Sequence, residues 1–387
     1  MKILHCCLAN YYIDNYGYQE NILPKMHKLQ GHEVAILAST ETFVDNNNVG
    51  YIEPKSYCSE DGIPITRLPY SKLLLHSIMK TLRMYKGISI ELEKFKPKII
   101  FLHGFQFLDI KHFVKYAKKN PDVKIFIDSH ADYFNSARSW FSRNILHKII
   151  YRHCAKIIEP YTTRFYGVLP ARVDFLMEIY KLPKEKVELL VMGAEDDKVQ
   201  QARSEKVKRE VRDALGIGPE DFLIVTGGKI DATKKHIFLL MEAVHEIPDK
   251  TVKLIVFGSI AEDLKDSLKS LSDGKRVQYI GWMEADQTYR YFAAADLVVF
   301  PGTHSVFWEQ VVGLGIPIIV KYFEGMTHID AGGNCVFLYQ DSVQEIRDRI
   351  IEIQSDREKF AKMKKVAEEI GMQRFSYKEI AKRAIEG

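Results

Sequence analysis

Cysteine is scarce in this chain, and its spacing shows no pairing. The 387 residues include five cysteines: Cys6, Cys7, Cys58, Cys154 and Cys335. Zinc sites and disulfide frameworks are built from cysteines at short, repeated spacings, and no such spacing occurs here. We therefore expect neither a metal site nor a disulfide framework, and the pattern favours a reducing compartment such as the cytoplasm.

Long hydrophobic runs and a strong net charge are also absent. No apolar stretch approaches the roughly 20 residues that a membrane-spanning helix needs. The N-terminal MKILHCCLANYY is too short in its apolar part for a secretion signal and is predicted to be a first strand. The net charge is only +4, which gives no reason to expect nucleic acid as a partner.

A length of 387 residues exceeds what one hydrophobic core usually supports, so two domains are expected. Short apolar runs alternate with amphipathic segments in both halves, which is typical of α/β domains with doubly wound sheets. We predict two Rossmann-like domains facing across a cleft, at residues 1–195 and 196–365, with a polar linker at 193–205. The segment 366–387 is predicted to be a helix that returns to the first domain.

The first half carries specific predictions of secondary structure. The basic segment 73–95 is predicted to form one helix, and the basic segment 137–152 a second one. The short apolar run 155–159 is predicted to be a strand, and a helix is expected near Thr163.

The stretch 295–334 contains a strand, helix, strand pattern. The run LVVF is broken by PGTH, a helix is predicted at about 305–314, and the second apolar run IIV follows. A helix that starts at the carboxyl end of a parallel sheet directs free N–H groups outward, which suits an anion. We predict phosphate binding at Ser305, Val306 and Phe307, although an ordinary crossover helix is the better explanation of these features taken alone.

The glycine-rich loop GGKIDATKK follows a predicted strand and carries two separated cations. Beside Gly228, Lys229 and Lys234 supply positive charge that suits a diphosphate group. A solvated basic loop without a ligand is the alternative.

Several short motifs, taken in order, resemble the retaining, sugar-nucleotide-dependent glycosyltransferases of family 4, which have the GT-B fold. The resemblance covers nearly the whole chain, and it implies transfer from a nucleotide-diphosphate sugar, with uridine as the base, to a glycan or lipid-linked acceptor in surface polysaccharide synthesis. The motifs are Gly17 after the first strand, GHEV at 31–34, GGKIDATKK at 227–235, the turn at Gly281 and Trp282, AADLVVFPG at 294–302, GLGIP at 313–317 and FSYKEIAKR at 375–383.

The resemblance assigns the basic loop a catalytic role. The usual motif of the family is Gly-Arg with a Lys five residues after the Arg, and Gly228, Lys229 and Lys234 fall at that spacing. Lysine in place of arginine loses the bidentate fork but keeps the point charge.

The chain departs from the family at its pair of glutamates. Gly302 stands at the position of the first acid, and Gln310 stands at the second, with Glu309 one residue earlier. Gln310 can still bond ribose hydroxyls, because an amide both donates and accepts, and Glu309 can do so if the helix register shifts. His304 is the nearest polar residue that could replace the lost contact with the donor sugar; a structural turn residue is the alternative.

Three further residues match family positions around the donor. His130, at a strand end, matches a histidine beside the donor sugar and is assigned as catalytic, although a satisfied structural histidine is the alternative. Gly17 matches a glycine whose backbone approaches a phosphate closely, and a simple tight turn is the alternative. Trp282 matches a backbone contact to the nucleobase, whereas a lone aromatic is more often part of the core.

The resemblance also implies a front-side attack without a protein nucleophile. The lysines and the helix start would stabilise the leaving diphosphate, so we expect no metal and no cofactor beyond the nucleotide-sugar co-substrate.

The acceptor is expected at the N-terminal half, where the segments 72–86 and 138–152 mix basic and apolar residues. These segments suit contact with the anionic, inner face of a membrane. The alternative is that they are ordinary helices with solvated basic faces. The residues concerned in the second segment are Arg138, Trp140, Phe141, Arg143, Lys148 and Arg152.

Two other classes of function stay open. A non-catalytic nucleotide-sugar-binding protein would explain the missing first glutamate. A nicotinamide-dependent dehydrogenase would share the sheet architecture, but no Gly-x-Gly-x-x-Gly follows the first strand.

Overall fold

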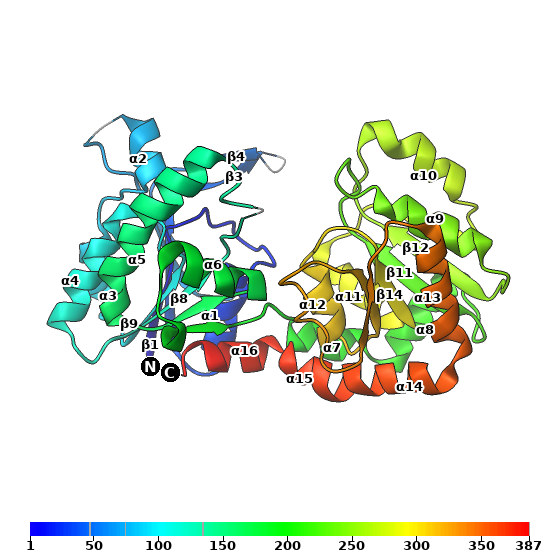
Figure 1. Ribbon diagram of the computed structural model, residues 1–387. Coiled ribbons are helices and arrows are strands. Elements are labelled where there is room, and N and C mark those ends of the chain that lie inside the picture. The colour runs from blue at the N-terminus through cyan, green and yellow to red at the C-terminus, as the bar shows by residue number, and fades with distance from the viewer. Residues whose placement is uncertain (46–47, 74, 134, 387) are drawn as a thin grey trace. The chain divides into compact units, whose positions relative to one another are not determined.

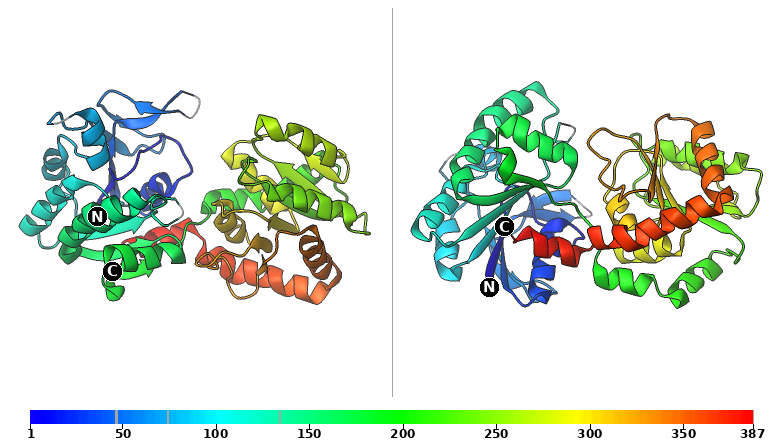
Figure 2. Two further views of the ribbon diagram at one scale, coloured as in Figure 1. Left: turned by 45° about the horizontal axis from the view of Figure 1, so that its top comes forward. Right: turned by 60° about the horizontal axis from the view of Figure 1, so that its bottom comes forward.

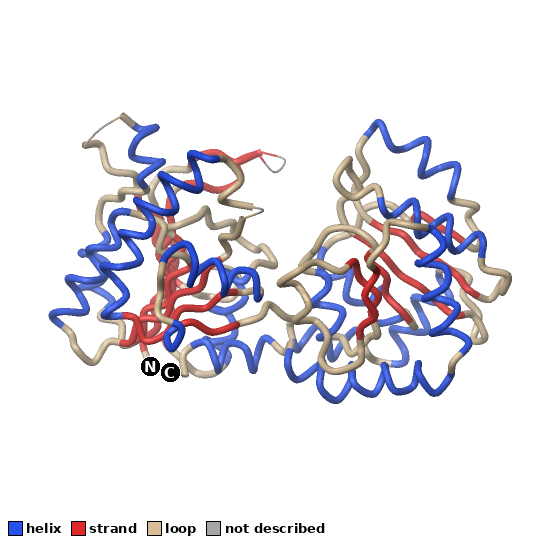
Figure 3. Tube along the Cα trace, in the orientation of Figure 1, coloured by secondary structure: helices blue, strands red, loops and turns tan. Residues whose placement is uncertain are grey.

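The computed structural model describes residues 1–45, 48–73, 75–133 and 135–386 (Figure 1). The chain divides into two compact units. The N-terminal unit comprises Met1–Val191 and the residues from Ala381 onward, and the C-terminal unit comprises Met192–Ile380. Each unit has a central sheet flanked by helices (Figures 2 and 3), which is the architecture that the alternating sequence pattern predicts.

The N-terminal unit is built on an eight-stranded sheet with the order β10-β9-β8-β7-β1-β2-β6-β5. Neighbouring strands run parallel, apart from the antiparallel pair β5 and β6. The chain extends from β1 to one side through β2 and later to the other side through β7, so the topological switch point lies between β1 and β7. The strands are β1 (Lys2–Cys7), β2 (Glu33–Ser39), β5 (Ser56–Cys58), β6 (Pro64–Leu68), β7 (Ile99–His103), β8 (Lys124–Ser129), β9 (Thr162–Gly167) and β10 (Val187–Leu189), with a separate hairpin of β3 (Glu41–Asp45) and β4 (Asn48–Tyr51).

Amphipathic helices cover this sheet. In α1, for example, Ile22, Leu23 and Met26 recur at helical spacing and are all buried. The helices are α1 (Gln19–Leu29), α2 (His76–Leu82), α3 (Ile88–Phe95), α4 (Lys111–Lys119), α5 (Arg152–Ile158) and α6 (Pro170–Tyr180), and a π-helical segment, Ser142–Tyr151, runs directly into α5.

Three predictions for this unit are wrong in detail. The segment 73–95, of which residue 74 lies outside the described chain, is two helices, because Arg83 (φ 51°) and Gly87 (φ 107°) adopt left-handed conformations between them. The expected strand at 155–159 lies in α5, and the expected helix near Thr163 is strand β9. A short apolar run does not distinguish a buried helix from a strand, which accounts for the error at 155–159.

The C-terminal unit has a six-stranded, wholly parallel sheet with the order β13-β12-β11-β14-β15-β16. The chain extends from β11 to one side and from β14 to the other, so the switch point lies between these two strands. Ligands of open α/β sheets bind at the carboxyl ends of the strands at such a point. The strands are β11 (Phe222–Gly227), β12 (Val252–Phe257), β13 (Val277–Tyr279), β14 (Leu297–Phe300), β15 (Ile318–Lys321) and β16 (Cys335–Leu338).

The helices of this unit begin inside the segment predicted as the linker. Asp196–Ala202, within the polar segment 193–205, forms helix α7, which has two acids in its first turn. The other helices are α8 (Glu205–Ala214), α9 (His236–Glu246), α10 (Lys265–Leu271), α11 (Ala285–Ala294), α12 (Phe307–Gly313), α13 (Val343–Ser355), α14 (Arg357–Val366), α15 (Met372–Arg374) and α16 (Tyr377–Ala384). The residues of α16 from Ala381 onward belong to the N-terminal unit.

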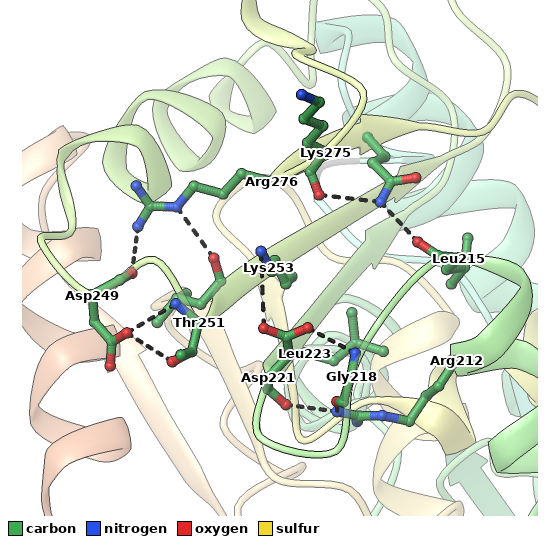
Figure 4. Close-up of polar contacts among 12 residues, drawn as sticks. Arg212, Leu215, Gly218, Asp221, Leu223, Asp249, Thr251, Lys253, Lys275 and Arg276 are labelled. Atoms are coloured by element: carbon green, nitrogen blue, oxygen red, sulfur yellow. Dashed lines mark hydrogen bonds and ion pairs between the residues drawn. The ribbon is translucent and has the colours of Figure 1, made fainter.

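Arginines hold the amino-terminal edge of this sheet (Figure 4). Arg276 donates to the backbone carbonyls of Val252 and Asp249, and burial lowers its pKa. Arg212 donates to the carbonyl of Asp221 at 2.6 Å. These cations satisfy carbonyl groups at the amino edge, whereas ligands of open α/β sheets bind at the opposite, carboxyl edge.

Each unit has its own apolar core, as a domain of this size requires. All five cysteine thiols are free, and Cys6, Cys7 and Cys154 are buried. In the part of the chain that the structure describes, no helix combines the length and the apolar character that crossing a bilayer requires.

Candidate functional site

The loop after β11 has a fixed shape. The Oδ1 atom of Asp231 accepts hydrogen bonds from the backbone N–H of Thr233 at 2.9 Å and from its hydroxyl at 2.6 Å. The backbone N–H of Ile230 donates to the carbonyl of Ser259 at 2.7 Å, which ties the loop to the segment after β12. An aspartate that bonds the backbone two residues ahead makes an Asx turn, so the loop is held by its own side chains.

Two glycines let this loop approach its neighbour closely. Gly228 and Gly258 have φ values of +129° and +131°, which side chains rarely adopt. A Cβ atom on Gly258 would lie 1.8 Å from the carbonyl oxygen of Gly228. The N–H of Gly258 donates to the carbonyl of Gly281 at 2.8 Å, so the predicted turn at Gly281 and Trp282 is joined to the same cluster of loops.

The loop presents the two predicted lysines. The ammonium of Lys229 is mostly exposed, at 72%, and lies 3.4 Å from a carboxylate oxygen of Asp231. Lys234 is half-buried, and among the described residues no carboxylate lies within ion-pair distance of it. Desolvation lowers the pKa of Lys234; Asp231 raises it, and the charge of Lys229 lowers it again. Lys234 is therefore a cation that the protein desolvates without supplying a counter-ion in contact.

A small hollow connects the lysines to the loop after β14. It measures about 40 Å³ and lies at the carboxyl ends of β11 and β14, the switch point of the sheet. Among its lining residues are Gly228, Lys229, Lys234, Thr303 and Ser305. A hollow of about 390 Å³ beside α7 is larger, but it is not at the carboxyl edge and contains no such pair of lysines. Position and charge, rather than volume, identify the smaller hollow as the candidate site.

Helix α12 starts later than predicted. It begins at Phe307, with Val306 as the N-terminal cap residue, and not at Ser305. The hydroxyl of Ser305 accepts a long hydrogen bond, 3.4 Å, from the N–H of Phe307. Val306 is partly exposed, whereas the ring of Phe307 packs on Phe257 and Phe292. Ser305 borders the hollow, whereas the partly buried ring of Phe307 packs against other aromatic rings.

Glu309 is fully buried and already bound. Its Oε1 atom accepts hydrogen bonds from Nε2 of His304 and from Nε2 of His328, both at 2.8 Å. Burial alone would raise the pKa of Glu309, but the two histidines outweigh burial and hold the pKa well below its usual value. The carboxylate therefore fixes His304. It is not free for the direct contact with ribose that was predicted for a shifted helix register.

Gln310 and Trp282 occupy contrasting environments. Gln310 is buried, and its amide donates to the hydroxyl of Thr288 at 2.9 Å. This bond occupies one of the donors that the sequence analysis assigned to ribose. Trp282 is 69% exposed, so it is not the core residue that a lone aromatic usually is.

In the N-terminal unit, His130 stands one residue after β8. Its Nε2 atom lies 3.7 Å from Oδ2 of Asp128, and its side chain is 30% exposed. Burial lowers the pKa of His130, but the nearby carboxylate of Asp128 raises it more, so the net pKa is raised. This imidazole is partly accessible and biased toward its charged form.

Behind Asp128, three histidines form a continuous hydrogen-bonded chain. The contacts run from the Ala381 carbonyl to His27 Nε2 (2.7 Å), from His27 Nδ1 to His5 Nε2 (2.9 Å), from His5 Nδ1 to His103 Nε2 (3.1 Å), and from His103 Nδ1 to Asp128 (2.9 Å). A carbonyl can only accept, so His27 must carry its hydrogen on Nε2, and each following ring is forced into the same tautomer.

The last link then contains one additional hydrogen. With His103 Nε2 already protonated, its Nδ1 faces a carboxylate, and one of the two must carry a further hydrogen. Burial would raise the pKa of Asp128, but the charge of His103 and its hydrogen bond lower the pKa well below the usual range. Asp128 is therefore ionised, and its carboxylate accepts the hydrogen bond from Nδ1 of His103. Desolvation keeps His5 and His27 neutral, with a pKa of about 4 for His27.

Gly17 shows no backbone need for glycine. A Cβ atom there would meet nothing within 4 Å, and its φ is not in the left-handed region. The residue is exposed, so the backbone is accessible on that side, but the structure gives no further sign of its predicted phosphate contact.

Several residues of these clusters were missed by sequence reasoning. His328 was not singled out, because it lies 19 residues after Glu309 with strand β15 between them. His5 stands in the otherwise apolar strand sequence KILHCC, and a titratable residue in a buried strand was a signal that could have been used.

Comparison with known proteins places the fold in a class. A solved glycosyltransferase from Rickettsia africae is similar over 99% of this chain and 96% of its own, with a TM-score of 0.68 and 13% identity. The Anabaena protein HepE in complex with UDP-glucose is similar over 99% of this chain and 98% of its own, with a TM-score of 0.65 and 15% identity. These likenesses show the fold: the protein has the GT-B fold of two Rossmann-like units, as predicted.

The sequence comparisons name the family that the C-terminal unit resembles. Residues 207–370 match the family model "Glycosyl transferases group 1". A mannosylfructose-phosphate synthase of Agrobacterium fabrum is 24% identical over 202 residues, which are 48% of this chain and 42% of that protein. The chain thus matches less than half the length of this curated relative. The predicted resemblance to GT-B glycosyltransferases is confirmed.

Proposed function

We propose that this protein is a retaining glycosyltransferase that moves a sugar from a nucleotide-diphosphate donor to a hydroxyl of a glycan or lipid-linked acceptor. The observation that carries the proposal is Lys234, a half-buried ammonium without a counter-ion in contact, next to Lys229 at the switch point of a unit that matches the group 1 family. UDP is proposed as the nucleotide, with support from the HepE complex with UDP-glucose.

A diphosphate is the anion that this arrangement suits. Two unit charges about 4 Å apart attract each other by about 4 kcal/mol at the effective dielectric constant of a protein surface. The attraction grows as the sugar–oxygen bond breaks and the diphosphate gains charge, so the lysines stabilise the transition state more than the bound donor. Asp231 already neutralises part of the charge of Lys229, and Lys234 therefore contributes the larger share.

The reaction is written as a front-side displacement. The bond between the anomeric carbon and the diphosphate oxygen breaks, and the acceptor hydroxyl oxygen bonds to the same face of that carbon, so configuration is retained. The hydroxyl proton passes to the departing diphosphate. We propose that no added divalent ion is required, because the lysines supply the positive charge at the leaving group.

Other residues of the site receive supporting roles. We assign donor binding to Gly228, Ser305 and Trp282, through backbone amides and an exposed indole, and sugar contact to His304, which Glu309 orients. His130 is proposed to bond the transferred sugar, with its charge set by Asp128.

The acceptor side of the proposal includes an anionic membrane surface, where a lipid-linked precursor of a surface polysaccharide would be held. Trp140 and Phe141 are 72% and 58% exposed, which is unusual for large apolar side chains. Arg152 does not contribute, because it donates to the carbonyl of Ile179. Sedimentation with anionic vesicles at low salt tests this part, with Trp140→Ala expected to weaken binding; absence of binding by the unaltered chain would end it.

The central experiment measures donor binding and transfer separately. A thermal-shift panel of nucleoside diphosphates and their sugars identifies the donor, and a transfer assay with radiolabelled donor follows. The double variant Lys229→Ala/Lys234→Ala is expected to lose transfer while keeping its fold, and Lys235→Ala, an exposed neighbour, serves as the matched control. Unchanged turnover in the double variant would refute the role of the lysines.

The same experiment separates the alternative function. A non-catalytic nucleotide-sugar-binding protein is favoured by one observation, the lack of a free carboxylate near the donor sugar: Gly302 replaces the first acid, and Glu309 is buried. Such a protein would show thermal stabilisation by the donor but neither transfer nor hydrolysis of it.

A further inference from the structure

The contact between Glu309 and two histidines is the densest cluster of ligating atoms that the described part of the chain contains. Its three members come from different places: Glu309 from the first turn of α12, His304 from the loop after β14, and His328 from the connection between β15 and β16. Each of the three residues offers one ligand atom, and these atoms all lie within 4.8 Å of one another. We propose that His304, Glu309 and His328 form a binding site for a divalent transition-metal ion, with zinc as the best fit.

The chemistry of the three groups supports zinc. Two imidazoles and one carboxylate are a recurrent ligand set of zinc sites with three protein ligands, in which the fourth position is left to water or substrate. Carboxylate–carbonyl sets that suit calcium or magnesium contain no histidine. Both imidazoles direct Nε2, rather than Nδ1, at the same carboxylate oxygen, so three ligand atoms already converge.

The buried negative charge of Glu309 also suits a bound cation. Glu309 and His328 are fully buried, and Oε2 of Glu309 has no hydrogen-bond partner among the described residues. If each histidine simply donates from Nε2 as a neutral ring, the cluster buries one uncompensated negative charge, which is costly. A divalent ion bound to Oε1 and to both Nε2 atoms requires each neutral ring to carry its hydrogen on Nδ1 instead of Nε2, and the cluster with the ion then has a single positive charge.

The geometry requires only a small adjustment. Ligands that surround a tetrahedral zinc ion at about 2.0–2.1 Å are separated from one another by about 3.3 Å. The two observed contacts of 2.8 Å would each lengthen by about half an ångström, and the separation between the two histidine ligand atoms, which is within 4.8 Å, would settle to the same value through side-chain rotation.

The site also has an accessible side. His304 is partly exposed, and its chain neighbours Thr303 and Ser305 line the hollow that holds the lysines. The fourth coordination position can therefore open toward that hollow. Metal binding at the cluster is independent of the proposed transferase activity, in which the lysines supply the positive charge at the leaving group.

The test measures metal directly. The full chain, carrying no histidine tag, is stripped with a chelator, and its zinc content after re-addition is determined by mass spectrometry. Co²⁺ titration, followed by visible absorption, reports tetrahedral coordination. We expect stoichiometric binding by the unaltered chain, and a loss of affinity of more than about tenfold in His328→Gln and in Glu309→Gln, since even second-shell changes cost that much.

Controls separate the site from general effects. His112→Gln removes a partly exposed histidine of the other unit that bonds Ser89, and it is expected to bind zinc like the unaltered chain. Glu309→Gln keeps the size and the acceptor oxygen, so its fold should persist; the thermal shift of the unaltered chain on adding zinc gives a readout that needs no variant. Equal, trace zinc in the unaltered chain and in His328→Gln, with no tetrahedral Co²⁺ spectrum, would overturn the proposal in favour of a proton-bridged cluster. Because no donor is present, this outcome would leave the transferase proposal unaffected.

Discussion

Replacing Lys234 with methionine should change stability and ligand binding in opposite directions. Methionine keeps an unbranched apolar stem of similar length and removes the ammonium. The pKa of Lys234 is lowered from 10.5, so keeping this group charged destabilises the folded protein below its folded pKa, and the cost falls as pH rises from the folded pKa and is gone above 10.5. At neutral pH the ligand-free variant should therefore be more stable than the unaltered chain.

Donor binding should weaken in the same variant. A hydrogen bond to a charged group contributes about 1.5–3 kcal/mol, which corresponds to a loss of about 10- to 150-fold in affinity for a nucleoside diphosphate. Lys235→Met is the matched control: it removes one positive charge from the same loop, but Lys235 is exposed and does not line the hollow. We expect this control to change affinity and stability little.

Thermal denaturation without ligand and calorimetric titration with UDP measure the two effects. A structural lysine would show the reverse pattern, with lower stability and unchanged binding, and that result would refute the reasoning. An equal loss of affinity in Lys234→Met and Lys235→Met would show that only the overall charge of the loop matters.

Two further predictions concern other parts of the fold. His27 has a pKa of about 4 in place of 6.5, so the stability linked to its neutral form is complete above pH 6.5 and is lost as pH falls toward 4, by about 3 kcal/mol. In urea unfolding, the free energy of unfolding of His27→Gln should therefore depend less on pH over this range. An unchanged pH dependence would contradict the assignment. Gly258→Ala should destabilise the protein by more than about 2 kcal/mol, since it combines a φ of +131° with a contact of 1.8 Å to Gly228, whereas Gly17→Ala, in open space, should stay within about 0.5 kcal/mol; similar unfolding midpoints for the two variants would show that the loop yields without cost.

The fold could be predicted from the sequence largely because the strands of the C-terminal unit are continuous apolar runs bounded by glycine or polar turns. LVVF and IIV are strands β14 and β15, as expected. The errors lie where this signal is weak. The segment 155–159 is apolar because it faces the core as part of a helix, and Thr162–Gly167 is a strand whose sequence, TTRFYG, contains few apolar residues.

The candidate site was predictable only where its residues share one loop. Lys229 and Lys234 lie on the same loop, so their spacing already indicated that both could face one anion. The cluster at Glu309 depends on His328, which reaches it only after strand β15 has been added to the sheet. The histidine chain of the N-terminal unit likewise joins residues of different elements: His5 of β1, His27 of α1 and His103 of β7. No local pattern brings these three together.

The hydrogen bond from His27 to the carbonyl of Ala381 has a practical consequence for dissecting the chain. A fragment that stops at Val191 would lack the carbonyl that accepts this hydrogen bond. The imidazole of His27 would then have a buried N–H group without an acceptor. Its tautomer would no longer be dictated, and the order of the rings as far as Asp128 could reverse. Separate production of the N-terminal half should therefore graft the tail from Ala381 onward back onto it.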